Sequence, residues 1–487
     1  MVLRGGEASG YHSIAAIEGE PHVVRRDLVR SDSVGEIEVA SRLACFLHLT
    51  DLHVTDVQSP ARFEFFNREF ADPRFHELLP MQRPQEALNV HAIAAMVRTL
   101  NRIEAGPLAG IAPELAIMSG DAVDNVQWNE LANFMALLDG GQVHVDSGAE
   151  RYEGVQAAGW PDDFFWKPDR AEARYGRAFG FPHLPGLLER ALKPFAAEGL
   201  RTPWLGCRGN HEEVCQGVGI VTPRLAAAMV GPHKPLRLPA GIDPDLALET
   251  FVHTPEAFMA GPDLPVTPDP DRRPFSVGEL VDMLKGHGFG GESRTRYVHD
   301  TQTVRLVVLD TVCAAGGADG CIGEDQMRWL ERSLREARDR PVVIVSHHTL
   351  DTLDNPRTSP GPRHVARDEL LETVHRSGSV VLWLNGHVHA NAVRAHPDPN
   401  RAGKGFWEVT TSSLVDWPCQ ARLIEIFAAG DGLLAIACTM IDHDSDEDSL
   451  AWLHRELAGN VPLGGFAAGR AGTALDRNAI LLVRARF

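Results

Sequence analysis

Short apolar runs that end in polar residues recur along this chain of 487 residues, and their recurrence limits the fold more than any other feature. Segments with apolar positions at helical spacing separate the runs. Such an alternation of strands and helices is typical of a layered α/β protein. The expected strands are residues 43–49, 115–118, 203–207, 304–309, 342–345 and 380–384, and the expected helices include 89–103, 128–138 and 324–337.

Two stretches interrupt this alternation, near residues 140–200 and 218–291, where Pro, Gly and Asp are frequent. We interpret both as insertions on the substrate side of a catalytic core. Residues 406–440 contain alternating apolar positions, which predict closing strands of a second sheet. The expected organisation is an N-terminal extension at 1–40, a catalytic domain at 41–440, and a tail at 441–487 that packs on the core.

Composition excludes several classes of protein. The formal net charge of −19 opposes a broad attraction to nucleic acid backbones, so nucleic acid is a disfavoured partner. No uninterrupted apolar run reaches the ~18 residues that a membrane-spanning helix needs. The first eleven residues lack the apolar segment of a signal peptide, which makes the cytoplasm the expected location.

The number and spacing of the cysteines do not predict a set of disulfides. There are seven of them, an odd number, and no pair has C-x-x-C spacing. We therefore expect most of them to be reduced and buried, as free cysteines usually are. Cys313 and Cys321, which flank residues 314–320, are the pair to check for a contact.

Side chains that bind metals follow five of the expected strands. One such cluster alone is weak support, because a lone D-x-H arises by chance and a single His at a strand end is usually a hydrogen-bonding residue. Five clusters in order, all at strand ends, predict one composite site, since loops held by a rigid scaffold carry much of the chemistry. The clusters are Asp51-Leu52-His53, Gly120-Asp121-Ala122-Val123-Asp124, Gly209-Asn210-His211-Glu212, Ser346-His347-His348 and Gly386-His387-Val388-His389.

The residue types in these clusters indicate the chemistry. Carboxylate oxygen together with imidazole nitrogen suits Mn²⁺, Fe²⁺ or Zn²⁺ better than a calcium or thiolate site. In extended backbone, the two outer residues of D-x-H or H-x-H lie on one face and can reach one centre. Glycines before Asp121, Asn210 and His387 are expected to let the chain turn sharply. Two metals ~3.5–4 Å apart can clamp the attacking and leaving oxygens of a phosphoryl group, which is a hydrolase arrangement.

Together the clusters resemble the signature of the calcineurin-like metallophosphoesterases: D-x-H, G-D-x-x-D, G-N-H-[DE], H and G-H-x-H. The chain carries all five parts between about residues 41 and 440. The resemblance implies a four-layer αββα sandwich, two mixed β-sheets flanked by helices, here with long loop insertions. It also implies two divalent metal ions, one held by Asp51, His53, Asp121 and His389, the other by Asp121, Asn210, His347 and His387.

The same resemblance implies roles for residues beside the metals. His211 is the expected catalytic group, and Asp124 is expected to orient its ring through a carboxylate–imidazole hydrogen bond. We prefer His347 to His348 as a ligand because it comes first after the strand, and His348 stays the alternative. Many large bacterial members of the family are exported, so secretion is an alternative to the cytoplasm.

We therefore expect a binuclear metal-dependent phosphoesterase that hydrolyses a small phosphomonoester or phosphodiester by attack of a metal-bridging hydroxide. Two divalent ions would leave the site positive after Asp51 and Asp121 are counted, although the whole chain is acidic. A metal-dependent nuclease is one alternative, which a basic groove beside the metals would favour. A metal-bound binding module without turnover is the other. The sequence leaves the natural substrate, the metals and the oligomeric state open.

Overall fold

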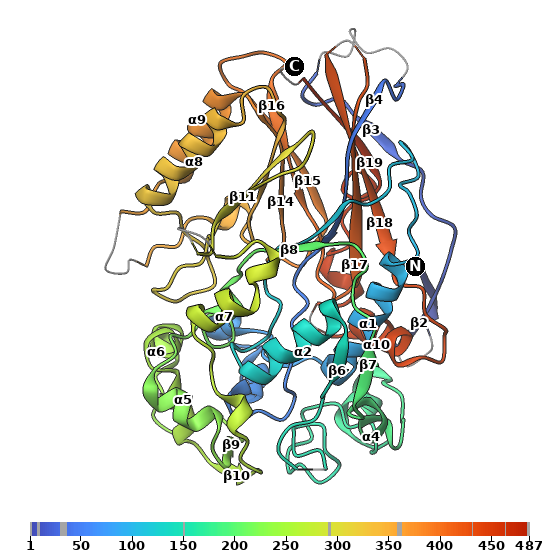
Figure 1. The fold of residues 1–487 in the computed structure, drawn as a ribbon. Helices are drawn as coiled ribbons and strands as arrows, with labels where there is room; N and C mark the ends of the chain where they lie inside the picture. Colours follow the sequence, from blue (N-terminus) through green and yellow to red (C-terminus); the bar gives the residue numbers. More distant parts are fainter. Residues whose placement is uncertain are drawn as a thin grey trace.

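The computed structural model describes residues 2–6, 10–29, 37–149, 151–290, 294–357, 363–430, 432–462 and 464–484. The outer ends of the predicted extension and tail, at residues 1 and 485–487, lie outside these ranges, as does residue 291 at the end of the second predicted insertion. Two large sheets pack face to face, and helices cover their outer faces (Figure 1). This arrangement confirms the expected four-layer α/β sandwich.

The larger sheet has seven strands among the described residues, and it is mixed. β4, β5 and β8 run parallel to one another. On the other side of β4, the successive pairs β4–β17, β17–β18 and β18–β19 are antiparallel. In sheet order the strands are β3 (Val23–Arg25), β19 (Ala479–Arg484), β18 (Leu433–Asp442), β17 (Gln420–Ala428), β4 (Ser41–Leu49), β5 (Leu115–Met118) and β8 (Trp204–Gly206).

The second sheet has six strands in the described part of the chain. Its four central strands are parallel, and an antiparallel strand lies at each edge. The order is β11 (Tyr297–Asp300), β12 (Arg305–Val308), β13 (Val342–Val345), β14 (Val380–Asn385), β16 (Gly405–Thr410) and β15 (Ala392–Pro397).

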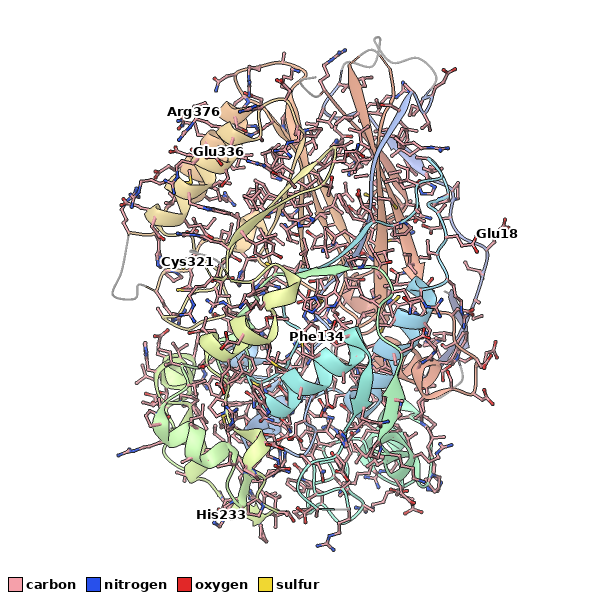
Figure 2. All side chains as sticks on the ribbon, in the orientation of Figure 1. Glu18, Phe134, His233, Cys321, Glu336 and Arg376 are labelled. Carbon is pink, nitrogen blue, oxygen red and sulfur yellow. The ribbon has the colours of Figure 1, made fainter. Side chains whose placement is uncertain are left out.

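Alternation of side chains along each strand builds the layers. Phe46 of β4 and Leu306 of β12 belong to the apolar core between the sheets, whereas their neighbours Leu47 and Val307 face the helices. Figure 2 shows side chains filling the space between the two sheets. Helices α1 (Asn89–Leu100) and α2 (Trp128–Asp139) cover the seven-stranded sheet, and α8 (Glu324–Glu336) and α9 (Arg367–Ser377) cover the other.

The two predicted insertions form the lower part of the molecule in Figure 1. The first contains β6 (Gly141–Val143), α3 (Arg174–Phe179), α4 (Leu187–Ala191) and β7 (Phe195–Ala197). Its aromatic residues make small local cores, such as Trp160 with Phe165. The second contains α5 (Pro223–Met229), β9 (His233–Pro235), α6 (Ala247–His253), β10 (Asp263–Pro265) and α7 (Val277–Met283). Outside the insertions lie β1 (Val2–Gly6), β2 (His12–Ala15) and α10 (Leu450–Asn460).

The prediction for residues 406–440 is wrong in one respect. Of the three strands in this region, β16 joins the six-stranded sheet, but β17 and β18 join the sheet that contains β4. β17 pairs antiparallel with β4 along most of its length. An alternating apolar pattern identifies a strand but not its partner, so the pattern could not assign these strands to a sheet.

Two expectations from composition agree with the structure. No helix in the described ranges is long and apolar enough to cross a membrane. The seven cysteines are all free, and six are buried, whereas Cys321 is partly exposed.

Candidate metal centre

The chain leaves β4 in a conformation that the sequence did not predict. Asp51 and His53 have φ angles of 51° and 46°, in the left-handed region, so the expected extended backbone is wrong. Their amides donate to the carbonyls of Gly120 and Asp121, both at 3.0 Å, and the loop thus pairs with the next loop instead of continuing the strand. The two histidines of the H-x-H cluster after β14 have φ angles of 67° and 54°. Such angles cost of order 1–3 kcal/mol each and concentrate at functional sites.

The glycines of the clusters act mainly by giving room. Gly120, at a φ of 100°, makes the turn that was predicted for it. Gly209 has a φ of −107°, which any residue adopts. A Cβ atom there would lie 2.2 Å from Oδ1 of Asp121, and one on Gly386 would lie 2.3 Å from Oδ2 of Asp51. At these two positions glycine therefore lets a carboxylate approach the backbone.

A first group of donor atoms consists of Asp51, His53 and His389, which lie within 4.8 Å of one another. The two Nε2 atoms of the histidines are 3.1 Å apart, and Nε2 of His389 is 3.3 Å from Oδ1 of Asp51. That oxygen is buried and has no hydrogen-bond donor among the described residues. Because a buried carboxylate oxygen without a partner is costly, this group fits a cation.

A second group lies beside the first and shares Asp121 with it. Oδ2 of Asp121 is 3.1 Å from Nε2 of His347 and 3.7 Å from Nε2 of His53. Oδ1 of Asn210 is also 3.1 Å from Nε2 of His347. His387 contributes a ring whose centroid is 5.1 Å from that of His347. Asp121 thus lies between the two groups.

Contacts to Nδ1 orient three of the histidine rings. In each of three rings Nδ1 contacts an oxygen of the protein, which fixes the ring and leaves Nε2 directed at the cluster. The contacts are His53 with Oδ1 of Asp124 at 3.2 Å, His389 with Oδ2 of Asp416 at 2.7 Å, and His347 with the carbonyl of Ser119 at 2.9 Å.

His348 differs from His347 in how its ring is used. Its Nδ1 lies 2.8 Å from Oγ1 of Thr311, and its Nε2 lies 2.9 Å from the carbonyl oxygen of Ala318. Although the ring is near His347 and His387, both of its nitrogens already have partners. His347 is therefore the member of the pair that presents a ring nitrogen to the cluster.

The expected bond between Asp124 and His211 differs from the observed one. Nδ1 of His211 contacts the backbone carbonyl of Asp124 at 2.6 Å, whereas the carboxylate contacts His53. The buried guanidinium of Arg62 pairs with this carboxylate and holds it away from His211. His211 presents Nε2 to the cluster, 4.0 Å from Oδ2 of Asp121.

Glu212 connects two of the loops, a role that the sequence reasoning did not assign. Its buried carboxylate accepts hydrogen bonds from the amides of Gly209, Asp121 and Ala122, at 2.7 to 3.0 Å. Burial and the charge of Asp121 raise the pKa of Glu212 to about 7. The signal for this role in the sequence was the acidic residue at the end of the G-N-H-E cluster, which is Glu212 itself.

The carboxylate of Asp121 and two of the histidine rings are held in the charge state that metal ligands need. Burial raises the pKa of Asp121, but the neighbouring His347 and His211 outweigh it and hold that pKa well below its usual range. Burial lowers the pKa of His53 to about 4 and that of His387 to about 3. Ionised carboxylate and neutral imidazole are the forms that bind metals. His347 and His389 differ: burial lowers their pKa, but the charge of Asp121 raises that of His347 to about 9 and the charge of Asp51 raises that of His389, so these two rings would release a proton when a metal binds.

A cavity of about 200 Å³ opens over the cluster, and His53, Asp121, His211 and His389 are part of its lining. Arg83 and Arg470 also line it, and nothing in the sequence marked them. Nε of Arg83 and Nη1 of Arg470 pair with the two oxygens of Asp416, at 2.9 and 2.6 Å. The cavity thus combines candidate metal ligands with positive side chains.

The family model for calcineurin-like phosphoesterases matches residues 184–391. Over this range, which is less than half of the chain, the sequence is similar to that family. The match includes the clusters at Asn210, His347 and His387, and the structure brings Asp51 and Asp121 from outside it into the same centre. Candidate ligands for two metals are therefore present, as in the predicted signature.

Individual relatives give narrower information. The chain is 33% identical over 97 residues to the glycerophosphodiester phosphodiesterase GpdQ of Enterobacter lignolyticus (strain SCF1), which covers 19% of this chain. The match spans about a third of that relative's length. A dimetal phosphatase from Danio rerio aligns over 83% of this chain and all of its own, with 12% identity and a TM-score of 0.39.

Proposed function

We propose that this chain is a binuclear metal-dependent phosphoesterase that hydrolyses a small phosphoester. One observation carries the proposal: imidazole nitrogens and carboxylates converge on two adjacent positions that share Asp121. One ion would be held by Asp51, His53, Asp121 and His389, and the other by Asp121, Asn210, His347 and His387. Mixed oxygen and nitrogen donors favour Mn, Fe or Zn.

When bound, two such ions would supply a hydroxide nucleophile at neutral pH and stabilise the charge on the phosphoryl oxygens. His211 is the group of this chain placed to move a proton. Its Nδ1–H donates to the carbonyl of Asp124, which leaves Nε2 facing the cavity. A protonated Nε2 would donate to the leaving oxygen as the ester bond breaks, a contribution worth ~10²–10⁴ in rate.

Arg83 and Arg470 would bind charged groups of the substrate that do not take part in the reaction. Both guanidinium groups line the cavity, and both are positioned by Asp416. Arginine is well suited to oxygen atoms of phosphate and carboxylate because its donors form a planar fork.

The size of the site and the charge of the chain favour a small substrate. Pockets for drug-sized ligands measure ~300–1,000 Å³, and this cavity has about 200 Å³. The net charge of −19 disfavours a nucleic acid, which keeps the nuclease as a second candidate only. The relative that matches 97 residues is named as a phosphodiesterase, so we propose a small phosphodiester as the first class to test.

Metal removal tests this function. The protein is treated with a chelator, its metal content is measured, and activity is assayed with aryl phosphomonoesters, aryl phosphodiesters, cyclic nucleotides and a DNA oligonucleotide, before and after adding Mn²⁺. We expect activity to disappear with the metal and to return with Mn²⁺ but not with Ca²⁺. Full activity in a verified metal-free sample would contradict the mechanism, and two bound ions without turnover of any substrate would favour the binding module.

A further inference from the structure

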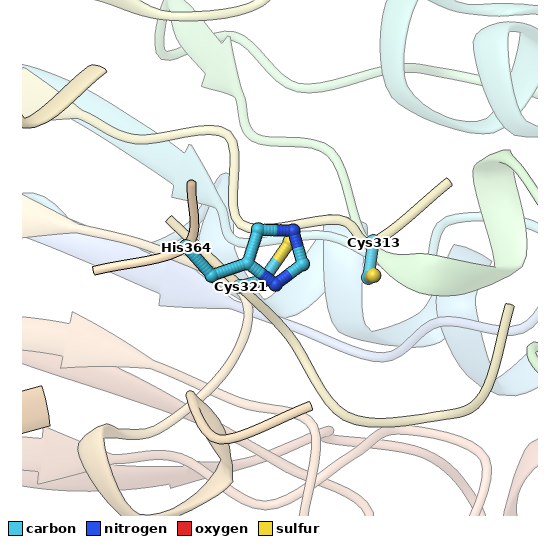
Figure 3. Close-up of side chains that lie close together, drawn as sticks. All are labelled: Cys313, Cys321 and His364. Carbon is cyan, nitrogen blue, oxygen red and sulfur yellow. The ribbon is translucent and has the colours of Figure 1, made fainter. Parts of the chain in front are cut away.

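Outside the cavity lies a third group of side chains of the types that bind metals. It consists of Cys313, Cys321 and His364, which we call the Cys–His cluster (Figure 3). The two sulfur atoms and one ring nitrogen lie within 4.8 Å of one another. Figure 2 places Cys321 at the side of the molecule, between the level of α8 and that of α6.

Backbone pairing brings the three residues together. The amide of Cys321 donates to the carbonyl of Thr311 at 2.9 Å, which closes the loop that begins at Cys313. Gly323 and His364 form an antiparallel bridge, and the amide of Val365 donates to the carbonyl of Ile322 at 2.8 Å. The position of His364 beside Cys321 is therefore set by main-chain hydrogen bonds.

The donor atoms of the cluster are available. Neither ring nitrogen of His364 has a hydrogen-bond partner within the described part of the chain. The thiols of Cys313 and Cys321 contact each other. Each also makes a weak contact with a backbone carbonyl, Cys313 with that of Arg357 at 3.6 Å and Cys321 with that of Val312 at 3.9 Å. An ion would displace these contacts at little cost.

We propose that Cys313, Cys321 and His364 bind one Zn²⁺-class ion, a site separate from the centre beside the cavity. Two thiolates with an imidazole are donors that Zn²⁺ prefers, and three protein ligands leave a fourth position. Bond lengths of about 2.3 Å to sulfur and 2.0 Å to nitrogen require donors ~3.5–3.8 Å apart in a tetrahedron. Small rotations of side chains already within 4.8 Å reach that geometry.

The surroundings of the cluster agree with this assignment. Cys321 and His364 are partly exposed, so the fourth position can take a water molecule. A disulfide between the cysteines would leave the imidazole of His364 without a role, whereas an ion uses all three donors.

The ion would hold a wall of the catalytic cavity. The loop between the two cysteines contains Ala318, which lines that cavity and whose carbonyl contacts Nε2 of His348 at 2.9 Å. Binding at the base of the loop would fix this contact. The Cys–His cluster would thus be a structural site that stabilises the cavity.

Cobalt tests the site because a cobalt–thiolate bond produces a charge-transfer absorption that oxygen and nitrogen ligands do not. The donor groups of the other centre contain no cysteine among the described residues, so the band reports the Cys–His cluster alone. Full-length apoprotein with reduced thiols is titrated with Co²⁺, and bound Zn²⁺ is counted by mass spectrometry. We expect the band to saturate at one ion per chain and Zn²⁺ to displace it.

The variants Cys313→Ser and Cys321→Ser should lose the band and one Zn²⁺ equivalent, and His364→Gln should weaken binding at least tenfold. Matched controls are His253→Gln, an exposed histidine of α6, and Cys45→Ala, whose thiol has its pKa raised to about 12 by burial. Both should keep the band. His364→Gln, at a partly exposed position, tests the site even if the serine variants do not fold.

A reduced protein without the band, or a band that survives in the Cys313→Ser and Cys321→Ser double variant, would overturn the proposal. Recovery of the pair as a disulfide that binds no ion after reduction would do so too and would indicate a redox role instead. None of these results depends on phosphoesterase activity.

Discussion

Nδ1 of His389 lies 2.7 Å from Oδ2 of Asp416, and the same buried carboxylate pairs with Arg83 and Arg470. A single side chain in the segment between β16 and β17 thus positions a candidate metal ligand and two positive groups of the cavity wall. Burial raises the pKa of Asp416, but the charges of Arg83 and Arg470 and the hydrogen bond from His389 outweigh it and hold that pKa well below its usual range. Asp416 therefore joins the metal centre to the substrate side of the cavity.

Asp416→Asn should weaken metal binding in the group of Asp51, His53 and His389. The amide oxygen can still accept from the ring, but the charge that raises the basicity of His389 is lost. Loss of such outer partners typically costs 10–100-fold in metal affinity. Competition with a chelator of known affinity measures the change, and Asp398→Asn, a buried carboxylate that pairs with Arg401 away from the cavity, is the control. Equal effects of both variants would count against the role of Asp416.

Asp121→Asn should weaken the binding of both ions, because Oδ2 of Asp121 faces His347 on one side and His53 on the other. We expect each affinity to fall by at least the 10–100-fold that loss of an outer partner causes. Isothermal titration of the metal-free protein resolves the two binding steps. If one ion binds as tightly as in the unmodified protein, Asp121 does not bridge.

His347→Ala should remove one ion, whereas His348→Ala should leave the metal content near that of the unmodified protein. The ring of His347 presents Nε2 to Asp121 and Asn210, but the ring of His348 is occupied by Thr311 and Ala318. Metal content per chain, measured after dialysis, distinguishes the two. The opposite result would reverse the assignment between these neighbours.

The sequence predicted several elements well, and it indicated which polar side chains would converge, because both depend on local patterns. β5 and β13 have the predicted bounds, and α1 begins at the predicted residue. Asp51, His53 and Asp121 follow strands that run parallel in one sheet, so their convergence follows from the direction of those strands.

The parts of the site that the sequence did not predict depend on contacts between segments that are far apart in the sequence. Asp416, Arg83 and Arg470 belong to no short motif, and they meet only because residues 83, 416 and 470 are folded against one another. The left-handed backbone at Asp51 and His53 arises from pairing with the loop at Gly120, which no single-strand pattern contains. The partner of Asp124 was likewise decided by Arg62, a residue in a separate segment.

Arg470→Ala should raise KM with little change in kcat if the guanidinium binds a charged part of the substrate that does not react. A hydrogen bond to a charged group contributes ~1.5–3 kcal/mol, so KM should rise by roughly 10–100-fold. Arg470→Lys should recover part of the loss. Arg401→Ala, which removes a guanidinium on another face, is the control. A loss in kcat with unchanged KM would place Arg470 in the reaction instead, and metal content must be measured because Arg470 contacts Asp416.

His211→Ala should lower kcat by ~10²–10⁴ for substrates with poor leaving groups, if its Nε2 donates the proton that the leaving oxygen needs. The metal content should stay intact. For aryl esters, whose leaving groups need little protonation, the loss should be much smaller. Steady-state rates across a series of leaving groups measure this dependence.

Asp124→Asn separates the role of His211 from that of the metal ligands. Nδ1 of His211 bonds to the backbone carbonyl of Asp124, which the variant keeps, whereas the carboxylate that it loses holds His53. Asp124→Asn should therefore weaken metal binding and lower rates equally for good and poor leaving groups. His211→Ala should lower them unequally. If His211→Ala loses metal, or if its effect is the same for all leaving groups, His211 is a ligand or a phosphate-binding group and not the general acid.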